Sequence, residues 1–150
     1  MNTINPDYVN AVMQTVNHSP FPSHIAFRMV SMDFDSARIE LDVLPQHMQP
    51  FGIVHGGVLA TLIDTATFWA GFMRLPEDYG LVNVDLKLNY LKAVVSGRLV
   101  AEGRCLRAGR SISYTEAAVR DTSGELVAHG TSTLMGLPGK GLKIPHPKFL

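Results

Sequence analysis

The most hydrophobic part of the chain lies over residues 57–73, where apolar side chains occur on nearly every side of a helix rather than along one stripe. A helix of this kind has to be enclosed by other elements, because little of its surface is suited to water. Asp64 and three threonines interrupt the stretch, and Pro76 follows soon after it. The pattern therefore predicts a central, enclosed helix over about 57–73, and it is a poor candidate for a membrane span.

A shorter amphipathic pattern stands near the N-terminus. Asn5 followed by Pro6 is typical of a helix start, since asparagine caps the first turn and proline suits its first position. Apolar residues then recur at i, i+3, i+4 and i+7 between residues 9 and 16. We expect a helix over about 5–17, ended by the prolines at positions 20 and 22.

Elsewhere the hydrophobic period changes to two, which is typical of strands. Strands that follow one another through short turns form an antiparallel sheet. The segments with this pattern are residues 25–33, 37–44, 81–90, 97–106, 111–120 and 126–134. In the third of them, strict alternation places one set of residues on one face and a second set on the other. The first set is Val82, Val84, Leu86, Leu88 and Tyr90, and the second is Asn83, Asp85, Lys87 and Asn89.

These elements predict a single α+β domain over residues 1–150, with an antiparallel β-sheet wrapped around one long central helix. The sheet can bury one side of the helix, and a second copy of the chain could cover the rest. The tail over about 136–150 is rich in Gly, Pro and Lys, so we expect it to be loose or draped over the surface.

Composition excludes several classes of protein. Thirteen basic and 13 acidic residues give a formal net charge of zero, which argues against recognition of nucleic acid through bulk charge. The N-terminus has no positive cluster before an apolar block, so no secretory signal is visible. Cys105 is the only cysteine, which fits a reducing cytoplasm. The six histidines show no metal-ligand spacing, so we expect no metal and no separate cofactor.

Asp64 is the residue in this helix that most needs an explanation. A carboxylate among apolar side chains is desolvated unless it faces a cavity, and either case disfavours its ionised form without a donor, a charge or water. Gly57, Thr61, Thr65 and Phe68 fall on the same helix face and make a narrow polar stripe with it. We interpret Asp64 as a functional acid, the alternative being a structural carboxylate that caps another loop.

The residues around this helix resemble those of a known family. Segment 49–57, read as Gln-Pro-Phe-Gly-Ile-Val-His-Gly-Gly, is followed by an acid nine positions after its histidine, as in the hotdog-fold acyl-CoA thioesterases. The nearest branch is the one that holds phenylacetate-pathway, enterobactin-proofreading and glutamate-type 4-hydroxybenzoyl-CoA thioesterases. The resemblance covers about residues 39–134 and implies hydrolysis of an acyl-CoA, whose coenzyme A enters as part of the substrate.

The resemblance also implies roles for the site residues. The Gly56 N–H and the Gln49 side chain hold the thioester oxygen, Asp64 acts as general base or nucleophile, and His55 orients the loop. Asp64 lies roughly 10 Å along the helix from Gly57, too far for one subunit to grip the carbonyl with both. The family takes the acid from one protomer and the carbonyl-holding groups from the other. We therefore expect a dimer with shared active sites, and a tetramer of two dimers.

Further residues are expected to contact the substrate, through the acyl group or through the phosphates of coenzyme A. They are Gly57, Thr65, Phe68, Asn83, Tyr90, Arg107, Gly109, Arg110 and Ser111.

The chain departs from its relatives in two ways. It combines aspartate with Gln49, where the family pairs glutamine with glutamate. It also carries Phe68 where some relatives have a Ser or Thr that positions water.

Three functions remain open at this point. The first is hydrolysis of an acyl-CoA with an apolar or aromatic acyl group, favoured by the aromatic residues Phe68, Trp69 and Phe72. The second is an acyl-CoA binder or sensor of the same fold without turnover. The third is a hydratase, which would need an Asp/His pair that the sequence does not offer convincingly.

Overall fold

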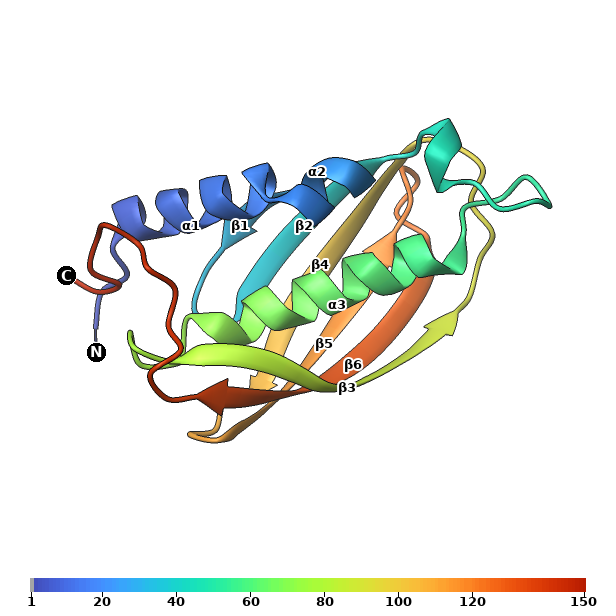
Figure 1. Cartoon of the computed structure of the whole chain (residues 1–150). Helices are drawn as coiled ribbons and strands as arrows, with labels where there is room; N and C mark the ends of the chain where they lie inside the picture. Colours follow the sequence, from blue (N-terminus) through green and yellow to red (C-terminus); the bar gives the residue numbers. More distant parts are fainter. Residues whose placement is uncertain (1) are drawn as a thin grey trace.

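The computed structural model describes residues 2–150 as one six-stranded antiparallel sheet that curls around a single long helix (Figure 1). The strand order is β1-β2-β4-β5-β6-β3, so β3 lies at one edge and β1 at the other. This arrangement confirms the predicted hotdog fold. The helices are α1 (Pro6–His18), α2 (Pro20–Ile25) and α3 (Gly56–Phe72), with a 3-10 turn η1 (Pro45–His47). The strands are β1 (Phe27–Met32), β2 (Ser36–Asp42), β3 (Gly80–Tyr90), β4 (Arg98–Arg107), β5 (Ile112–Arg120) and β6 (Leu126–Leu137).

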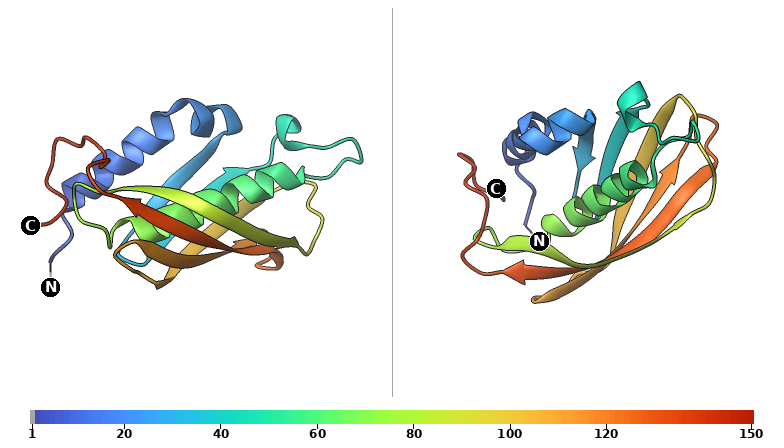
Figure 2. Two further views of the ribbon diagram at one scale, coloured as in Figure 1. Left: turned by 60° about the horizontal axis from the view of Figure 1, so that its bottom comes forward. Right: turned by 45° about the vertical axis from the view of Figure 1, so that its right-hand side comes forward.

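Helix α3 lies in the concavity of the sheet (Figure 2). It packs unusually close to β4, since a Cβ on Gly103 would stand 2.1 Å from the carbonyl oxygen of Ala66. Glycine is therefore required where the helix crosses this strand. Leu62, Ile63 and Ala66 are completely buried, and Ile63 packs by Gly130 of β6. These contacts fix the rotation of α3 and direct Asp64 toward β3.

A β-bulge in β3 corrects the expected alternation of that strand. Asn83 pairs with Leu134, but the next paired residue is Asp85, opposite Thr133, so Val84 is the extra residue. One additional residue reverses which side chains face the helix. Asn83 therefore shares the helix-facing side with Leu86, Leu88 and Tyr90, whereas simple period-two reasoning placed it on the opposite face.

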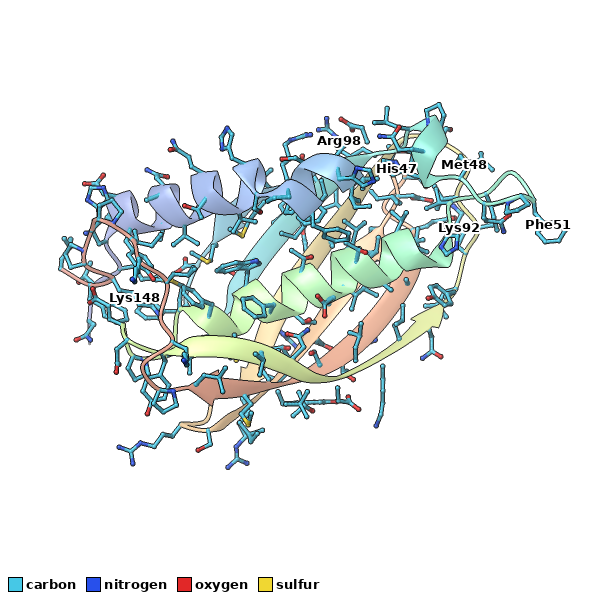
Figure 3. The ribbon with its side chains drawn as sticks, viewed as in Figure 1. His47, Met48, Phe51, Lys92, Arg98 and Lys148 are labelled. Atoms are coloured by element: carbon cyan, nitrogen blue, oxygen red, sulfur yellow. The ribbon has the colours of Figure 1, made fainter. Side chains whose placement is uncertain are left out.

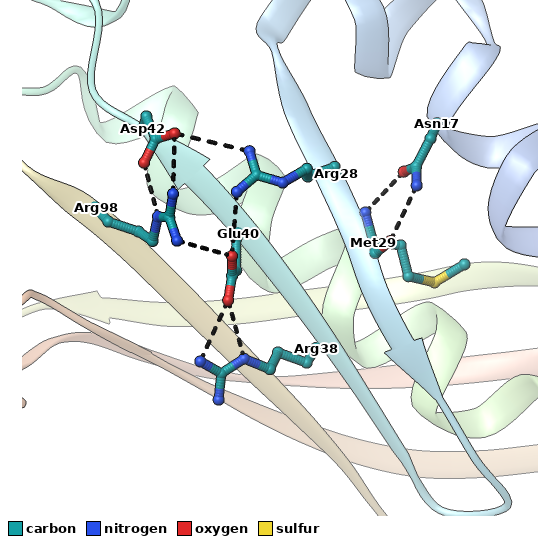
Figure 4. Close-up of polar contacts among 7 residues, drawn as sticks. All are labelled: Asn17, Arg28, Met29, Arg38, Glu40, Asp42 and Arg98. Carbon is teal, nitrogen blue, oxygen red and sulfur yellow. Dashed lines mark hydrogen bonds and ion pairs between the residues drawn. The ribbon is translucent and has the colours of Figure 1, made fainter.

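The two sheet edges differ in their protection. At the β1 edge, the side chain of Asn17 in α1 accepts a hydrogen bond from the Met29 N–H at 2.7 Å and donates one to the Met29 carbonyl at 2.9 Å (Figure 4). These bonds take the place of a neighbouring strand. The β3 edge has no such cover among residues 2–150 and exposes Val84 and Leu91. An uncovered apolar edge is suited to pairing with another chain.

The outer face of the sheet is polar over β1, β2 and β4. Glu40 lies at the centre of an ion-pair network with Arg28 at 3.2 Å, Arg38 at 3.3 Å and Arg98 at 3.4 Å (Figure 4). The guanidinium groups are partly exposed and remain solvated. This face is therefore suited to water, in contrast to the β3 edge.

Helix α2 is an element that the sequence reasoning missed. The expectation was that prolines end the first helix and that a strand starts at Ile25. The first helix does end at His18, but Pro20 then occupies the first position of a second helix, where its missing N–H is not needed. Ala26 leaves this helix with φ of 65°, and β1 begins one residue later.

The C-terminal tail is draped over the surface, and it is tied down rather than loose. Both termini lie at the same end of the molecule (Figure 1), where the Asn5 N–H donates to the Lys148 carbonyl at 3.1 Å. The side chain of Lys148 is fully buried, and its ammonium donates to the carbonyls of Phe72 and Leu75 at 2.8 Å each. It thus satisfies carbonyls at the end of α3, which attract a positive charge. No helix within residues 2–150 is long and apolar enough to cross a bilayer.

Lys148 should make stability depend on pH. Burial lowers the pKa of Lys148 to about 8, below its value in the unfolded chain. Between these two values the unfolded state binds more protons, so the free energy of unfolding rises with pH by up to about 1.4 kcal/mol per pH unit. Urea unfolding between pH 8 and 9.5 should detect this rise in the wild type and its loss in Lys148→Met. The exposed Lys140→Met serves as control, and an equal slope in both variants would contradict the assignment.

Candidate functional site

The bulge in β3 brings an amide to the acid of α3. Asn83 Nδ2 donates to Asp64 Oδ1 at 2.5 Å, and both side chains are only partly exposed. Burial raises the pKa of Asp64, and the hydrogen bond from Asn83 lowers it in part. A carboxyl whose pKa is raised by its surroundings accepts protons more readily, as a general base requires.

Asn83 also carries a buried oxygen without a partner. Its Oδ1 makes no hydrogen bond within residues 2–150, although the atom is inaccessible to solvent. The orientation of the amide follows from Asp64, because the carboxylate can only accept and so takes the NH₂ end. A buried acceptor without a donor is costly, so this amide beside the acid is retained at the expense of stability.

The N-terminus of α3 presents a single free N–H. His55 caps the helix through Nδ1, which accepts a hydrogen bond from the Gly57 N–H at 2.7 Å. The ring is therefore an acceptor at this nitrogen and is held as part of the turn. The Gly57 N–H is thereby occupied. The Gly56 N–H makes no hydrogen bond within the described part of the chain and can bind a carbonyl oxygen at the positive end of the helix.

The loop that carries Gln49 projects from the body of the protein, with Phe51 at its tip (Figure 3). The Phe51 side chain is 91% exposed. Gln49 Oε1 accepts a hydrogen bond from the Phe51 N–H. Since a backbone N–H needs an acceptor, this bond fixes the amide with its NH₂ group free to donate.

A cavity of about 410 Å³ connects this loop with the start of α3. Its walls are mainly apolar, and it includes three of the predicted site residues, Gln49, Gly56 and Tyr90. The sides of the cavity are completed by Leu59 and by the segment 91–94. Such a cavity, apolar with few polar groups, is of the kind that holds small ligands.

His47 is a residue that sequence reasoning missed. It is buried, its Nδ1 accepts from the Leu44 N–H at 2.9 Å, and its Nε2 is 2.6 Å from the Ile25 carbonyl, to which it donates. The His47 carbonyl accepts from the His55 N–H at 2.8 Å. His47 thus ties the two ends of the Gln49 loop to α2. No local pattern in the sequence marks it, because its partners are distant backbone groups.

The predicted phosphate contacts do not lie near the start of α3. Arg107, Gly109, Arg110 and Ser111 form the end of β4 and the turn to β5, and part of this turn lines a hollow with Arg74 just beyond the C-terminal end of α3. The helix separates them from Gly56 by about 24 Å along its axis. Within one chain, therefore, the turn cannot serve a substrate carbonyl held at Gly56 at close range.

The remaining predicted residues lie along α3. The Thr65 hydroxyl donates to the Thr61 carbonyl at 2.7 Å, so it is engaged with its own helix. Phe68 is partly buried and packs edge-on against Trp69, with ring centroids 4.9 Å apart. Phe68 therefore offers an apolar wall one helical turn beyond Asp64.

A larger hollow of about 660 Å³ lies elsewhere, on the outer face of the sheet. Its charged residues already pair with one another, as Arg104 does with Glu116 at 2.9 Å and His129 with Glu116 at 3.1 Å. It is on the opposite side of the sheet from α3, so it is no part of the site around Asp64. Within residues 2–150 no three His, Cys, Asp or Glu side chains converge as metal ligands.

Comparison with known proteins gives a consistent result. The family model of the Thioesterase superfamily matches residues 51–128, just over half of the chain. The crystal structure of thioesterase HI1161 from Haemophilus influenzae superposes with a TM-score of 0.83 at 26% identity, covering 97% of this chain and 100% of that one. The proofreading thioesterase EntH of Klebsiella pneumoniae is 27% identical over 114 residues, or 76% of this chain and 83% of its own. The 1,4-dihydroxy-2-naphthoyl-CoA hydrolase of Listeria monocytogenes is 24% identical over 110 residues, or 73% of this chain and 89% of its own.

The family match covers the Gly56 N–H at the start of α3, the half-buried acid in its middle and the amide on β3 that holds this acid. The sheet wrapped around a central helix is shared with a solved thioesterase over nearly the whole chain. The chain therefore belongs to the thioesterase superfamily of hotdog-fold proteins.

Proposed function

We propose that the protein hydrolyses an acyl-CoA thioester to the free acid and coenzyme A. The observation that carries this proposal is the pair Asp64–Asn83, a carboxylate of raised pKa beside a buried amide oxygen without a partner. The relatives named as a CoA hydrolase and as a proofreading thioesterase support this reaction. We also infer that the chain lies near the enterobactin-proofreading branch of the family.

We propose general-base catalysis rather than direct attack by the acid. Asn83 holds Asp64 through Oδ1, so a water on the open side of the carboxylate can donate one hydrogen to Oδ2. A lone pair of this water can then face the thioester carbon. The water oxygen bonds to the thioester carbon as its proton passes to Asp64. The tetrahedral intermediate then expels the thiolate, which takes the proton from Asp64.

The carbonyl must be held by a second copy of the chain. Gly56 and Asp64 are eight positions apart, or about 12 Å along α3, so one chain cannot grip a single carbonyl with both. Asn83 lies beside Asp64, and Tyr90 lies beside Gly56. Antiparallel pairing of β3 with β3 of a second copy can therefore bring the acid of one copy to the free N–H of the other.

We propose one register for that pairing. Opposite residues in an antiparallel pair share a face, and of the registers that this allows we choose the one in which Leu86 meets Leu88 of the other copy, because it brings Asn83 closest to Tyr90. Lys87 then meets its own equivalent on the two-fold axis, and the extra residue at Val84 brings Asn83 opposite Tyr90. Each Lys87 has Asp85 of the other copy as its diagonal neighbour, which offsets the repulsion between the two lysines. We expect two such dimers to form a tetramer.

The two ends of the substrate would meet different parts of this dimer. The acyl group lies against the aromatic wall of Phe68 and Trp69, which suits an apolar or aromatic group. The turn with Arg107 and Arg110 lies beyond the C-terminal end of α3 in the copy that supplies the acid. It can contact the phosphates of coenzyme A only if the part of coenzyme A between the thioester and the phosphates is extended.

The first test is thiol release from a panel of acyl-CoAs. Asp64→Asn removes the base but keeps an oxygen that can accept from Asn83, so we expect at least about a hundredfold loss of kcat with binding retained. The measurements are thiol release and calorimetric binding. Binding without turnover by the wild type would indicate a sensor instead, and loss of binding in Asp64→Asn would argue for a structural role. After turnover in water labelled with oxygen-18, incorporation of the label into the Asp64 carboxylate would indicate direct nucleophilic attack.

The second test is the pH dependence of thiol release. The carboxylate is the active form, so the rate rises with pH through the pKa of Asp64, which burial places above its ordinary value. Asn83→Ala removes the hydrogen bond that lowers this pKa, so its acidic limb should move to higher pH. Asn89→Ala, on the outer face of the same strand, is the matched control. If the acidic limb of Asn83→Ala does not move, Asn83 does not control the pKa of the base, and the assignment is wrong.

The third test addresses the register of the dimer. In a Cys105→Ala background, Lys87→Cys places two thiols across the two-fold axis, with Cβ atoms about 5 Å apart. Mild oxidation should cross-link this variant to a dimer on a non-reducing gel. Asn89→Cys, two residues away, should not link, because its equivalents lie on opposite sides of the axis. Faster cross-linking of Asn89→Cys, or a monomer in sedimentation, would contradict the arrangement.

A further inference from the structure

Tyr90 stands over the N-terminus of α3. It pairs with the buried Ala128 of β6, and its side chain therefore points to the helix side of the sheet. A Cβ built on Gly56 would lie 3.0 Å from Tyr90 Cζ and 3.2 Å from its hydroxyl oxygen. The ring thus occupies the space that a side chain at position 56 would need. Glycine at the carbonyl-binding position and tyrosine on the strand fit each other.

The Tyr90 hydroxyl is a donor without a fixed partner. It makes no hydrogen bond within residues 2–150, and 57% of the residue is exposed. Tyr90 lines the 410 Å³ cavity together with Gln49 and Gly56. Three residues that line this cavity therefore carry donors without a partner among residues 2–150, namely the Gly56 N–H, the NH₂ of Gln49 and the phenol of Tyr90.

We propose that Tyr90 is a catalytic residue whose hydroxyl donates to the thioester oxygen together with Gly56 and Gln49. This proposal rests on the proposed thioester hydrolysis. As water adds to the carbonyl carbon, the oxygen gains negative charge, and hydrogen bonds to a charged acceptor strengthen. The phenol keeps its proton throughout, so the reaction gains no extra proton transfer. Its contribution lies in the transition state and is expected mainly in kcat.

The phenol has a fixed position that the Gln49 amide lacks. Gly56 is fixed by the helix, and Gln49 stands on a projecting loop. Tyr90 belongs to the sheet, with the N–H of the following Leu91 bonded to the Val127 carbonyl at 2.8 Å. The strand thus positions the phenol independently of the Gln49 loop.

The experiment compares Tyr90→Phe with the wild type. We expect kcat for thiol release to fall about tenfold to a hundredfold, with little change in KM and in the pH midpoint of the acidic limb. Tyr114→Phe removes a phenol from the outer face of the sheet and should keep the wild-type rate. Only a hydroxyl is lost, so thermal melting should remain at the wild-type temperature.

A spectroscopic measurement tests the role of Tyr90 independently of whether the protein hydrolyses thioesters. In Asp64→Asn, infrared difference spectra of a bound acyl-CoA labelled at its carbonyl carbon report hydrogen bonding without turnover. Adding Tyr90→Phe should move the carbonyl stretch to higher frequency, toward its value in water-free solvent, even if the wild type releases no thiol. An unchanged stretch with unchanged kcat would overturn the proposal. So would a changed pH midpoint with an unchanged stretch, since Tyr90 would then act on Asp64.

Discussion

The structure depends on the enclosure of α3. This helix is apolar on almost every side, and the curled sheet covers it at Gly103 of β4 and at Gly130 of β6. The N-terminal helices and the C-terminal tail extend the cover, with Lys148 closing the last carbonyls of α3. The part of α3 that is least covered is the polar stripe around Asp64, which faces the β3 edge. We therefore propose that the same constraint leaves this polar stripe for a ligand and a second copy.

The distribution of groups along α3 is the reason why we propose a second copy of the chain. The free N–H stands at the first residue of the helix, the acid stands two turns further, and the predicted phosphate contacts lie beyond its last residue. A helix has a fixed rise, so these groups cannot approach one another within a chain. Antiparallel pairing reverses their order in the second copy. The protected β1 edge and the uncovered β3 edge leave only one of the two sheet edges available for that pairing.

Asp64 and Asn83 illustrate a compromise between stability and function. Burial of the carboxyl opposes its ionisation, and one hydrogen bond from Asn83 offsets only part of that effect. The amide oxygen that stays without a partner adds a further cost. An apolar pair at these positions would pack without either cost. We interpret the retained cost as the requirement of a base and of the water that it activates.

Much of the fold and of the candidate site could be predicted from the sequence, because the features that mark them are encoded by neighbouring residues. The apolar pattern of 57–73 marked the central helix, Asn5 and Pro6 marked the start of α1, and the spacing of His55 and Asp64 marked the family. These features depend on neighbours a few residues away. Helix α2 was missed because proline can end one helix and begin the next, and local composition does not decide between the two.

Tertiary structure alone decided the rest. A single extra residue at Val84 turned Asn83 toward Asp64, and period-two reasoning had no means to locate that bulge. His47 and Lys148 act on backbone groups far away in the chain, and their roles appear only when those groups are brought together. The sequence by itself determined which helix is buried and which acid it carries, because periodicity is local. The direction that each polar side chain faces was decided by strand register and long-range packing, which no local window contains.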